Sequence, residues 1–319
     1  MKRAAYFKFL SVTLLLVIAV ACTKDETVED SKPQLITSFV NDINADSLQA
    51  TVQWLEDMGT RFMLADNRRE VAVDLRDRFK RLGYPNAKLD SFFVSRTFRG
   101  TDYNIWQYNV VASTTGSVYA DSVIVFGAHY DNILSLGEGD PFTFNPGAND
   151  NASGVAATME MARLFKAKNY NLKYSMQFVL FAAEELGLYG GKDFAQKAYD
   201  NDEKIKLMIN YDMIGVPKST DKSRWIVNVV YYNNSINEAA KAKAACSEYS
   251  SIGSYSDNSF SDRSDSYPFV LKGYKPLFFI QDNLDGNYHT ANDLTTHMNF
   301  DYCREIVKAS CAMILEYNY

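Results

Sequence analysis

The sequence predicts an α/β protein in which helices cover both faces of a mixed, largely parallel central sheet. Short apolar runs rich in β-branched residues alternate with segments of helical periodicity, a pattern that favours strands connected through helices. About 280 residues follow the amino-terminal segment, which is enough for one domain with a single core. The content of 47% apolar and 23% charged residues is typical of a globular protein.

The elements are expected in a regular order along the chain. Helical spacing covers residues 47–58 and 66–82, and Gly83-Tyr84-Pro85 ends the second helix. Residues 251–266 are rich in Ser, Tyr, Asn and Asp and are expected to form a long loop, which in a compact domain is usually functional or disordered. The predicted strands are 89–94, 103–112, 122–126, 175–183, 206–211 and 276–280, and the further helices are 154–168, 188–198, 235–249 and 300–317.

Residues 1–21 have the layout of a secretory signal peptide, with basic residues before an apolar run. The run ends in Ala19-Val20-Ala21-Cys22, which resembles a bacterial lipoprotein box, so Cys22 is expected to become a lipid-bearing amino terminus. Cleavage before an unmodified cysteine is the alternative. Residues 22–34 then form a polar tether, and residues 35–319 form the folded domain. We therefore expect an exported protein that the lipid anchors to the cell envelope, at the outer membrane; Lys24-Asp25-Glu26 resembles signals for its outer face.

The charge balance argues against nucleic acid as a partner. Removing the signal region takes away Lys2, Arg3 and Lys8 and changes the net charge from -6 to -9. No basic run of the kind that binds nucleic acid remains in the sequence.

Candidate metal ligands follow several of the predicted strands. His129 and Asp131 come just after the strand 122–126, where open α/β sheets place their ligand sites. An imidazole binds a divalent metal through one nitrogen, and a carboxylate two residues on can accept a hydrogen bond from the other. Further candidates recur at the same ends of later strands or in a Gly- and Asn-rich turn before a helix, namely Asp150, Glu184, Glu185, Asp212 and His289.

Glu184 and Glu185 are adjacent at the end of an apolar strand, an arrangement that is costly unless a cation or a proton relieves it. Strand alternation would turn one glutamate toward a metal and its neighbour toward the substrate space. The residues alone do not decide which glutamate takes which role.

The ordered set from His129 to His289 resembles the zinc aminopeptidases called peptidase family 28, which have glutaminyl cyclase and glutamate carboxypeptidase relatives. The resemblance covers roughly residues 100–319 and implies a three-layer zinc-peptidase fold that binds two zinc ions. It implies that Asp150 bridges the two ions, that Glu185 and His289 complete one site, and that His129 and Asp212 complete the other. It also implies that Asp131 orients His129, that Glu184 is the general base and that Tyr288 stabilises the oxyanion.

One segment departs from the family pattern. Many relatives carry Ser-Asp-His-x-Pro-Phe where this chain has residues 264–269, and Ser266 replaces the histidine. Any substrate contact made by that imidazole is therefore in doubt. Phe260, Tyr267 and Phe269 are expected either to line a pocket for an apolar side chain or to pack in the core.

The expected reaction is hydrolysis of amino-terminal residues from peptides by a metal-activated water. A glutaminyl cyclase with a single zinc is the first alternative, and carboxypeptidase or dipeptidase action stays open. A surface binding lipoprotein without catalysis is the alternative from another class. Pairing of Cys246 with Cys303 or Cys311 also stays open.

Overall fold

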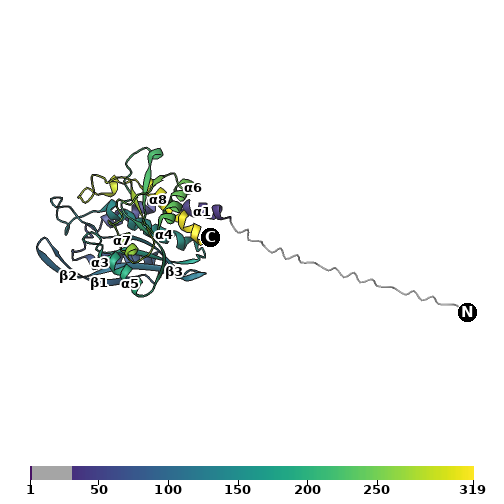
Figure 1. The fold of residues 1–319 in the computed structure, drawn as a ribbon, viewed down its shortest axis with the longest axis horizontal. Helices are drawn as coiled ribbons and strands as arrows, with labels where there is room; N and C mark the ends of the chain where they lie inside the picture. Colours follow the sequence, from purple (N-terminus) through teal and green to yellow (C-terminus); the bar gives the residue numbers. More distant parts are fainter. Residues whose placement is uncertain (2–30) are drawn as a thin grey trace. The chain divides into compact units, whose positions relative to one another are not determined.

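The computed structural model describes Met1 and residues 31–319 (Figure 1). The rest of the predicted signal peptide, Cys22 and most of the predicted tether lie outside the described residues and stay predictions. Helix α1 (Lys32–Val40) begins just before the position where the tether was expected to end. In the part of the chain that is described, no helix is long and apolar enough to cross a membrane.

Eight strands form one sheet in the order β1-β2-β4-β3-β5-β8-β6-β7. Four of the seven neighbouring pairs are parallel, so the predicted mixed and largely parallel sheet is confirmed. The strands are β1 (Lys88–Phe98), β2 (Thr101–Thr114), β3 (Tyr119–His129), β4 (Tyr174–Phe181), β5 (Lys204–Tyr211), β6 (Ile226–Val230), β7 (Gly253–Tyr255) and β8 (Pro276–Gln281). The sequence did not lead us to expect β6, and β7 lies inside the segment expected to be a loop.

Strands β1 and β2 form the long hairpin labelled at the lower left of Figure 1. Arg99 and Gly100 connect them, and both have positive φ angles, of 48° and 81°. Two consecutive residues of positive φ form the tight turn whose twist matches that of the flanking strands. The hairpin therefore continues the sheet without a bulge at its tip.

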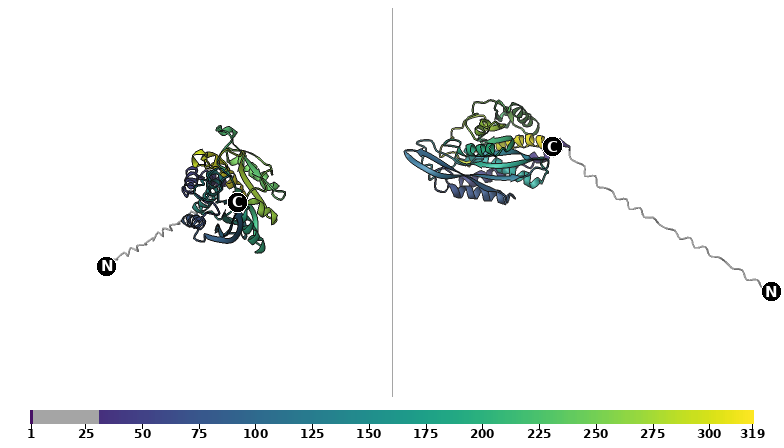
Figure 2. Two further views of the ribbon diagram at one scale, coloured as in Figure 1. Left: turned by 90° about the vertical axis from the view of Figure 1, so that its left-hand side faces the viewer. Right: turned by 60° about the horizontal axis from the view of Figure 1, so that its bottom comes forward.

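Helices cover both faces of the sheet, as predicted (Figures 1 and 2). One core joins the face of β3 that carries Ile124 and Phe126 to α4 and α8. The other core joins the face that carries Val125 to Phe194 of α5 and Phe269 of α7. The remaining helices are α2 (Ala45–Glu56), α3 (Arg68–Arg81), α4 (Ser153–Lys168), α5 (Tyr189–Asp200), α6 (Ile236–Tyr249), α7 (Ser266–Leu271) and α8 (Phe300–Asn318).

Local sequence sets where two of these helices start. The side chain of Asn44 accepts hydrogen bonds from the backbone N–H groups of Asp46 and Ser47 at the start of α2. Asn299 accepts in the same way from Tyr302 at the start of α8. Such capping side chains satisfy N–H groups that have no partner within the helix.

The start of α4 approaches the sheet closely because position 154 is glycine. A Cβ atom at Gly154 would lie 2.4 Å from the carbonyl oxygen of Tyr211 in β5 and 2.9 Å from Cβ of Ala128 in β3. Contacts this short are not tolerated, so a side chain here would push α4 away from the sheet. The turn that carries Asp150 directly precedes this contact and is held against the strand ends with it.

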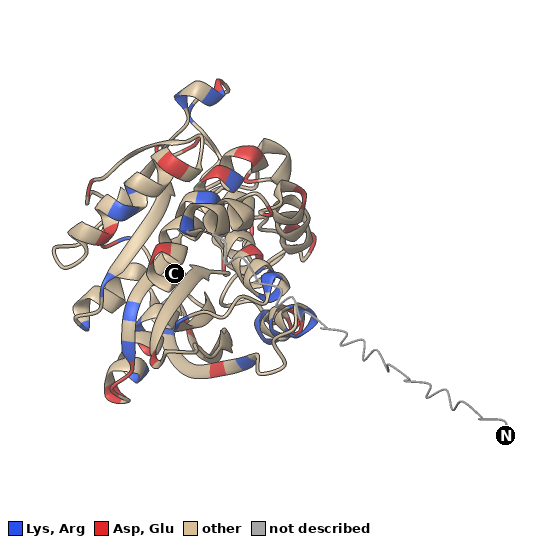
Figure 3. Cartoon of the chain, turned by 90° about the vertical axis from the view of Figure 1, so that its right-hand side faces the viewer, with Lys and Arg blue, Asp and Glu red and all other residues tan. Residues whose placement is uncertain are grey.

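Both signs of charge occur on the helices of the face drawn in Figure 3. Basic and acidic residues are interspersed there, and no continuous basic stripe crosses the face.

Candidate metal centre

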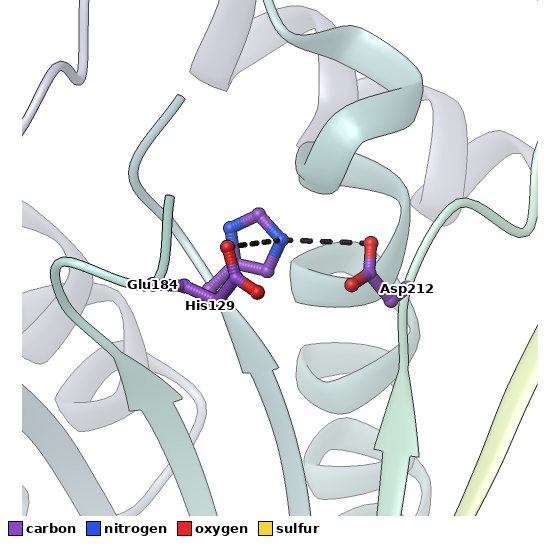
Figure 4. Close-up of side chains that lie close together, drawn as sticks. All are labelled: His129, Glu184 and Asp212. Atoms are coloured by element: carbon purple, nitrogen blue, oxygen red, sulfur yellow. Dashed lines mark ion pairs between the residues drawn. The ribbon is translucent and has the colours of Figure 1, made fainter. Parts of the chain in front are cut away.

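The carboxyl ends of four parallel strands bring most of the predicted ligands together. His129 is the last residue of β3, Asp212 directly follows β5, and His289 lies in the loop after β8. Glu184 and Glu185 follow β4. Figure 4 shows the imidazole of His129 between the carboxylates of Glu184 and Asp212, each at the end of a neighbouring strand.

Asp150 lies between the two imidazoles. Its Oδ1 atom is 3.3 Å from Nε2 of His129, and its Oδ2 atom is 3.0 Å from Nε2 of His289. The residue is only 5% exposed and sits in the irregular turn Ala148–Ala152 before α4. The two oxygens of one carboxylate therefore face two separate groups of ligands.

The other carboxylates complete these groups. Nε2 of His289 lies 3.1 Å from Oε2 of Glu185, while Nε2 of His129 lies 3.5 Å from Oδ1 of Asp212. Glu184 is slightly more distant, with its Oε2 atom 4.0 Å from Nε2 of His129. Within the described chain, two overlapping sets of side chains that share His129 have ligand atoms close enough to hold a metal ion: His129, Glu184 and Asp212, and His129, Asp150 and Glu185.

Buried polar atoms without partners show that this cluster suits a metal. Oε1 of Glu185, Oδ1 of Asp212 and Nε2 of His289 are buried and have no hydrogen-bond partner in the described structure. The nitrogen of His289 is near two carboxylate oxygens, but its geometry with them is not that of a hydrogen bond. Leaving such atoms unsatisfied costs free energy, and a divalent cation between them removes the cost. Imidazole and carboxylate ligands without thiolate suit zinc in a catalytic site.

The electrostatics of the protein groups alone shift several pKa values strongly. Burial raises the pKa of Glu184 well above its usual value, and burial together with the charge of Asp150 raises the pKa of Glu185 to about 7. Burial opposes ionisation of Asp150 too, but the two imidazoles close to its carboxylate lower its pKa. Burial also disfavours the charged form of His289, yet the nearby carboxylates of Glu185 and Asp150 raise its pKa to about 10. A cluster with this excess of acceptors is one that a cation stabilises.

Asp131 lies in the centre, but its contacts differ from the expected ones. Nδ1 of His129 is hydrogen-bonded to the backbone carbonyl of Asp131 at 3.1 Å, whereas the nearest carboxylate oxygen is 3.8 Å away. The carboxylate instead accepts hydrogen bonds from the backbone N–H groups of Glu184 and Glu185, at 2.9 and 3.3 Å. The carboxylate of Asp131 thus holds the turn that carries both glutamates, and its carbonyl orients the imidazole.

The expected strand alternation does not position the two glutamates. Strand β4 ends at Phe181, and Ala183 has a φ of 60°, so Glu184 and Glu185 occupy a turn and not the strand. Positive φ angles recur beside the site, at Ala183, Leu188, Met213 and His289. Non-glycine residues in this region are strained, and such residues cluster at functional sites.

A cavity of about 300 Å³ opens beside the ligands. Tyr288 lines it, and its ring stacks on His289 with the ring centroids 3.7 Å apart. The sequence left open whether Phe260 and Phe269 line a pocket or pack in the core. Phe260 lines the cavity, whereas Phe269 packs in the core against α5. Tyr267 is not among the lining residues of this cavity.

Residues 264–269, which depart from the family pattern, contact the metal centre through Asp212. Oγ of Ser264 donates a hydrogen bond of 2.7 Å to Oδ2 of Asp212 and accepts one of 2.7 Å from the side chain of Asn210. Ser266 is buried and shares a hydrogen bond of 2.7 Å with the hydroxyl of Tyr232. The residue in place of the histidine is therefore part of the core and does not line the cavity.

Two residues that the sequence reasoning missed hold the ligand-bearing loops. The guanidinium of Arg61, a residue 2% exposed, donates to the carbonyl oxygens of Tyr130, Leu55, Pro146 and Gly147 at 2.7–3.0 Å. The carboxylate of Asp293 accepts hydrogen bonds of 2.8 and 2.9 Å from the backbone N–H groups of Asn149 and Asp150. The sequence held a signal for Arg61, because an arginine directly before the apolar run 62–65 is expected to be buried and therefore to need hydrogen-bond partners.

The three described cysteines are free and buried, so the open question of a Cys246 disulfide is answered for them. Cys303 and Cys311 both lie on α8, and Cys246 lies on α6. His297 is exposed, and its Nδ1 is hydrogen-bonded to the carbonyl of Asn292 at 2.8 Å.

The sequence is similar to those of known peptidases. The model of the family described as "Peptidase family M28" matches residues 109–314. A "Probable zinc metalloprotease" of Pyrenophora teres f. teres is 30% identical over 214 residues, which cover 60% of this chain and 44% of that protein. A "Probable leucine aminopeptidase" of Arthroderma otae is 25% identical over 302 residues, covering 88% of this chain and 74% of that protein. This chain spans about half the length of the first curated relatives that it matches.

The fold has close counterparts among solved structures. The LapA aminopeptidase of Legionella pneumophila superposes with a TM-score of 0.74 at 19% identity, covering 93% of this chain and 78% of that one. At this level of identity the likeness establishes the fold alone, which is the α/β architecture predicted from the sequence.

Proposed function

The chain belongs to peptidase family M28, and on that premise we propose that it is a zinc-dependent exopeptidase that removes amino-terminal residues from peptides. The observation that carries the proposal is the position of Asp150, whose two carboxylate oxygens face the imidazoles of His129 and His289 at 3.3 and 3.0 Å. One carboxylate shared between two ligand groups favours a pair of metal ions over a single zinc. It therefore favours a hydrolase over a single-zinc glutaminyl cyclase.

Five residues would hold the metal. His129 and Asp212 would bind one zinc ion, Glu185 and His289 the other, and Asp150 both. Zinc ions bound there would stabilise negative charge on the reacting carbonyl oxygen and make water acidic enough to act as a nucleophile near neutral pH.

The remaining polar residues would move or stabilise charge. Glu184 would accept a proton from the attacking water at its carboxylate and then deliver one to the leaving amine. Burial raises the pKa of Glu184, a perturbation common among catalytic carboxyl groups, and its place beside His129 puts it next to the ligands. The hydroxyl of Tyr288, whose ring lines the cavity, would donate a hydrogen bond to the developing oxyanion.

The lining of the cavity supports a substrate with a positively charged end and an apolar side chain. Acidic residues at its base would attract the free α-amine of a peptide. The apolar wall beside them would accept an aliphatic or aromatic first residue. This wall consists of Met213, Phe260, Phe278, Ile280, Leu284 and Tyr288.

Zinc stoichiometry and two substrates test the proposal together. We expect two zinc ions per chain after loading, with hydrolysis of leucyl p-nitroanilide that a chelator abolishes and zinc restores. One zinc ion per chain with cyclisation of an amino-terminal glutaminyl peptide would instead identify a cyclase. Full zinc occupancy without turnover on a broad peptide library would identify a binding protein.

We also propose that the protein is exported and attached to the envelope by lipid on Cys22, because Ala19-Val20-Ala21-Cys22 follows a signal-like segment. Radioactive palmitate should label the wild-type protein expressed in a bacterium and should not label Cys22→Ser. Equal labelling of both proteins would contradict the assignment of the lipid site.

A further inference from the structure

Among the residues that the structure describes, Arg263 is the one arginine that lines the cavity, and no lysine lines it. Four carboxylates lie at the base of the cavity, and the apolar wall stands beside them. Arg263 and its neighbour Asp262 add an ionic group to this lining, in the loop between β7 and α7. The cavity thus combines an acidic base, an apolar wall and a single arginine.

The backbone places Arg263 close to the reacting groups. The next residue, Ser264, is buried, and its hydroxyl donates a 2.7 Å hydrogen bond to the proposed ligand Asp212. On the other side, the backbone N–H of Arg263 donates to the carbonyl of Phe260, which belongs to the apolar wall, at 3.0 Å. The arginine is therefore anchored between the metal centre and the wall, while its own side chain remains 74% exposed.

The guanidinium has only a weak partner in the protein. Its Nε atom lies 3.6 Å from Oδ1 of Asp262, whose side chain is 66% exposed, and solvent screens an ion pair of this kind. A guanidinium binds a carboxylate best through two parallel N–H donors. The guanidinium of Arg263 is exposed, so a substrate carboxylate can reach these donors without breaking a buried contact.

We propose that Arg263 binds a carboxylate of the substrate and thereby makes the enzyme prefer short peptides with a free carboxyl terminus, dipeptides above all. The inference rests on the proposed aminopeptidase function, because it needs the α-amine at the acidic base and the first side chain against the apolar wall. In that orientation the second residue of a dipeptide points away from the metal centre, and its carboxylate needs a cation at the edge of the cavity. Arg263 is the described lining residue that supplies one.

An acidic side chain on the first residue is the other source of a carboxylate. The apolar wall disfavours it, because a charged side chain packed against Phe278 and Ile280 would lose its hydration without gaining a partner. The carboxyl terminus is therefore the source to which we assign Arg263.

The experiment compares leucyl-glycine with leucyl-glycinamide, and leucyl p-nitroanilide with glutamyl p-nitroanilide, on the zinc-loaded full-length protein. For the wild type we expect kcat/KM to be about tenfold higher for the free acid than for the amide, since a charge-assisted hydrogen bond is lost with the amide. The ratio should fall toward one in Arg263→Gln and stay nearer the wild-type value in Arg263→Lys. It should rise in Asp262→Asn, because the competing carboxylate is gone.

Matched controls separate this role from general electrostatics. Arg96→Gln removes an exposed arginine of the β1–β2 hairpin and should keep the wild-type ratio of acid to amide. Added NaCl should reduce the ratio in the wild type, because it screens an exposed charge. In Arg263→Gln the ratio should hardly depend on salt.

Three results would overturn the inference. Equal kcat/KM for acid and amide in the wild type would show that no substrate carboxylate is recognised. An unchanged ratio in Arg263→Gln would assign the recognition to another group. A preference for glutamyl over leucyl anilide that Arg263→Gln removes would reassign the arginine to the first side chain. If the zinc-loaded wild type hydrolyses none of these substrates, the proposed function itself is rejected. That result differs from the three above, in which the enzyme is active but Arg263 does not have the proposed role.

Discussion

The contacts of Arg61 predict that replacing this one residue weakens both the fold and the metal centre. The guanidinium makes four hydrogen bonds to backbone carbonyls in the interior, among them those of Tyr130 and Gly147, which lie in the chain segments that carry His129 and Asp150. Arg61→Met fills a similar space but leaves these carbonyls without donors. At about 1 kcal/mol or more for each lost bond, the free energy of unfolding should fall by about 4 kcal/mol.

A fall of that size is a large part of the total stability of a domain, which is on the order of 10 kcal/mol. Urea unfolding of the chelator-treated protein measures it without any contribution from bound zinc. Arg61→Lys keeps the positive charge, but its compact ammonium group cannot reach carbonyls on several sides, so it should recover only part of the loss. Arg68→Met is the matched control, because Arg68 also donates to backbone carbonyls but is only partly buried, and it should cost less than Arg61→Met, about 1 kcal/mol or below.

Zinc affinity distinguishes a positioning role from simple core packing. If Arg61 fixes the two ligand-bearing segments, competition with a chromophoric chelator should show zinc binding about 10- to 100-fold weaker in Arg61→Met than in the wild type. Unchanged zinc affinity in a destabilised variant would reduce Arg61 to a packing role. A change in unfolding free energy below about 0.5 kcal/mol would refute the magnitude derived from the four hydrogen bonds.

The other predictions address the centre and one buried carboxylate. Glu184→Gln should keep its zinc and lose about 10²- to 10⁴-fold in kcat, and near-normal turnover would remove the base assignment. Asp150→Ala should lose zinc on dialysis, and retention of two ions per chain would contradict a bridging carboxylate. Ser264→Ala removes the hydrogen bond to Asp212 and should weaken zinc binding about 10-fold, by the same chelator competition; equal affinity would make that bond incidental. Burial opposes ionisation of Glu305, but hydrogen bonds from Lys308 and Ser251 lower its pKa overall. The carboxylate of Glu305 therefore stabilises the fold above about pH 4.3, the pKa of a glutamate in the unfolded chain. This stabilisation is lost as the pH falls through the lower pKa of the folded state. The urea midpoint should accordingly drop less between about pH 5 and pH 3 in Glu305→Gln, and parallel pH profiles would count against the shift.

The sequence predicted the central parallel strands β3, β4, β5 and β8 well because each carries its own signal. Residues 123–126 and 276–280, for example, are apolar over their whole length, as a strand buried on both faces requires, and candidate ligands follow at their carboxyl ends. Strand β6 was missed, since Asn228 interrupts its apolar run Ile226–Val230, and β7 is too short to show a period. Helix α7 begins where a loop was expected to end.

The contacts within the centre were less predictable because they join distant parts of the chain. The exchange of roles between the carboxylate and the carbonyl of Asp131 depends on where the turn after β4 lies. The backbone N–H groups of Asn149 and Asp150 donate hydrogen bonds to Asp293, which lies more than 140 residues further along the chain. Spacing in a single sequence carries no trace of such pairs, so the sequence could name candidate ligands but not the groups that hold them in place.

The buried thiols on α6 and α8 have a practical consequence for following motion in this molecule. Burial raises the pKa of Cys246 to about 11 and raises those of Cys303 and Cys311 as well, so none of the three reacts while its helix stays docked. An alkylating reagent can modify each sulfur only during a transient opening, and mass spectrometry can assign each modified peptide. The three alkylation rates then report separately how often each region of these two helices exposes its interior.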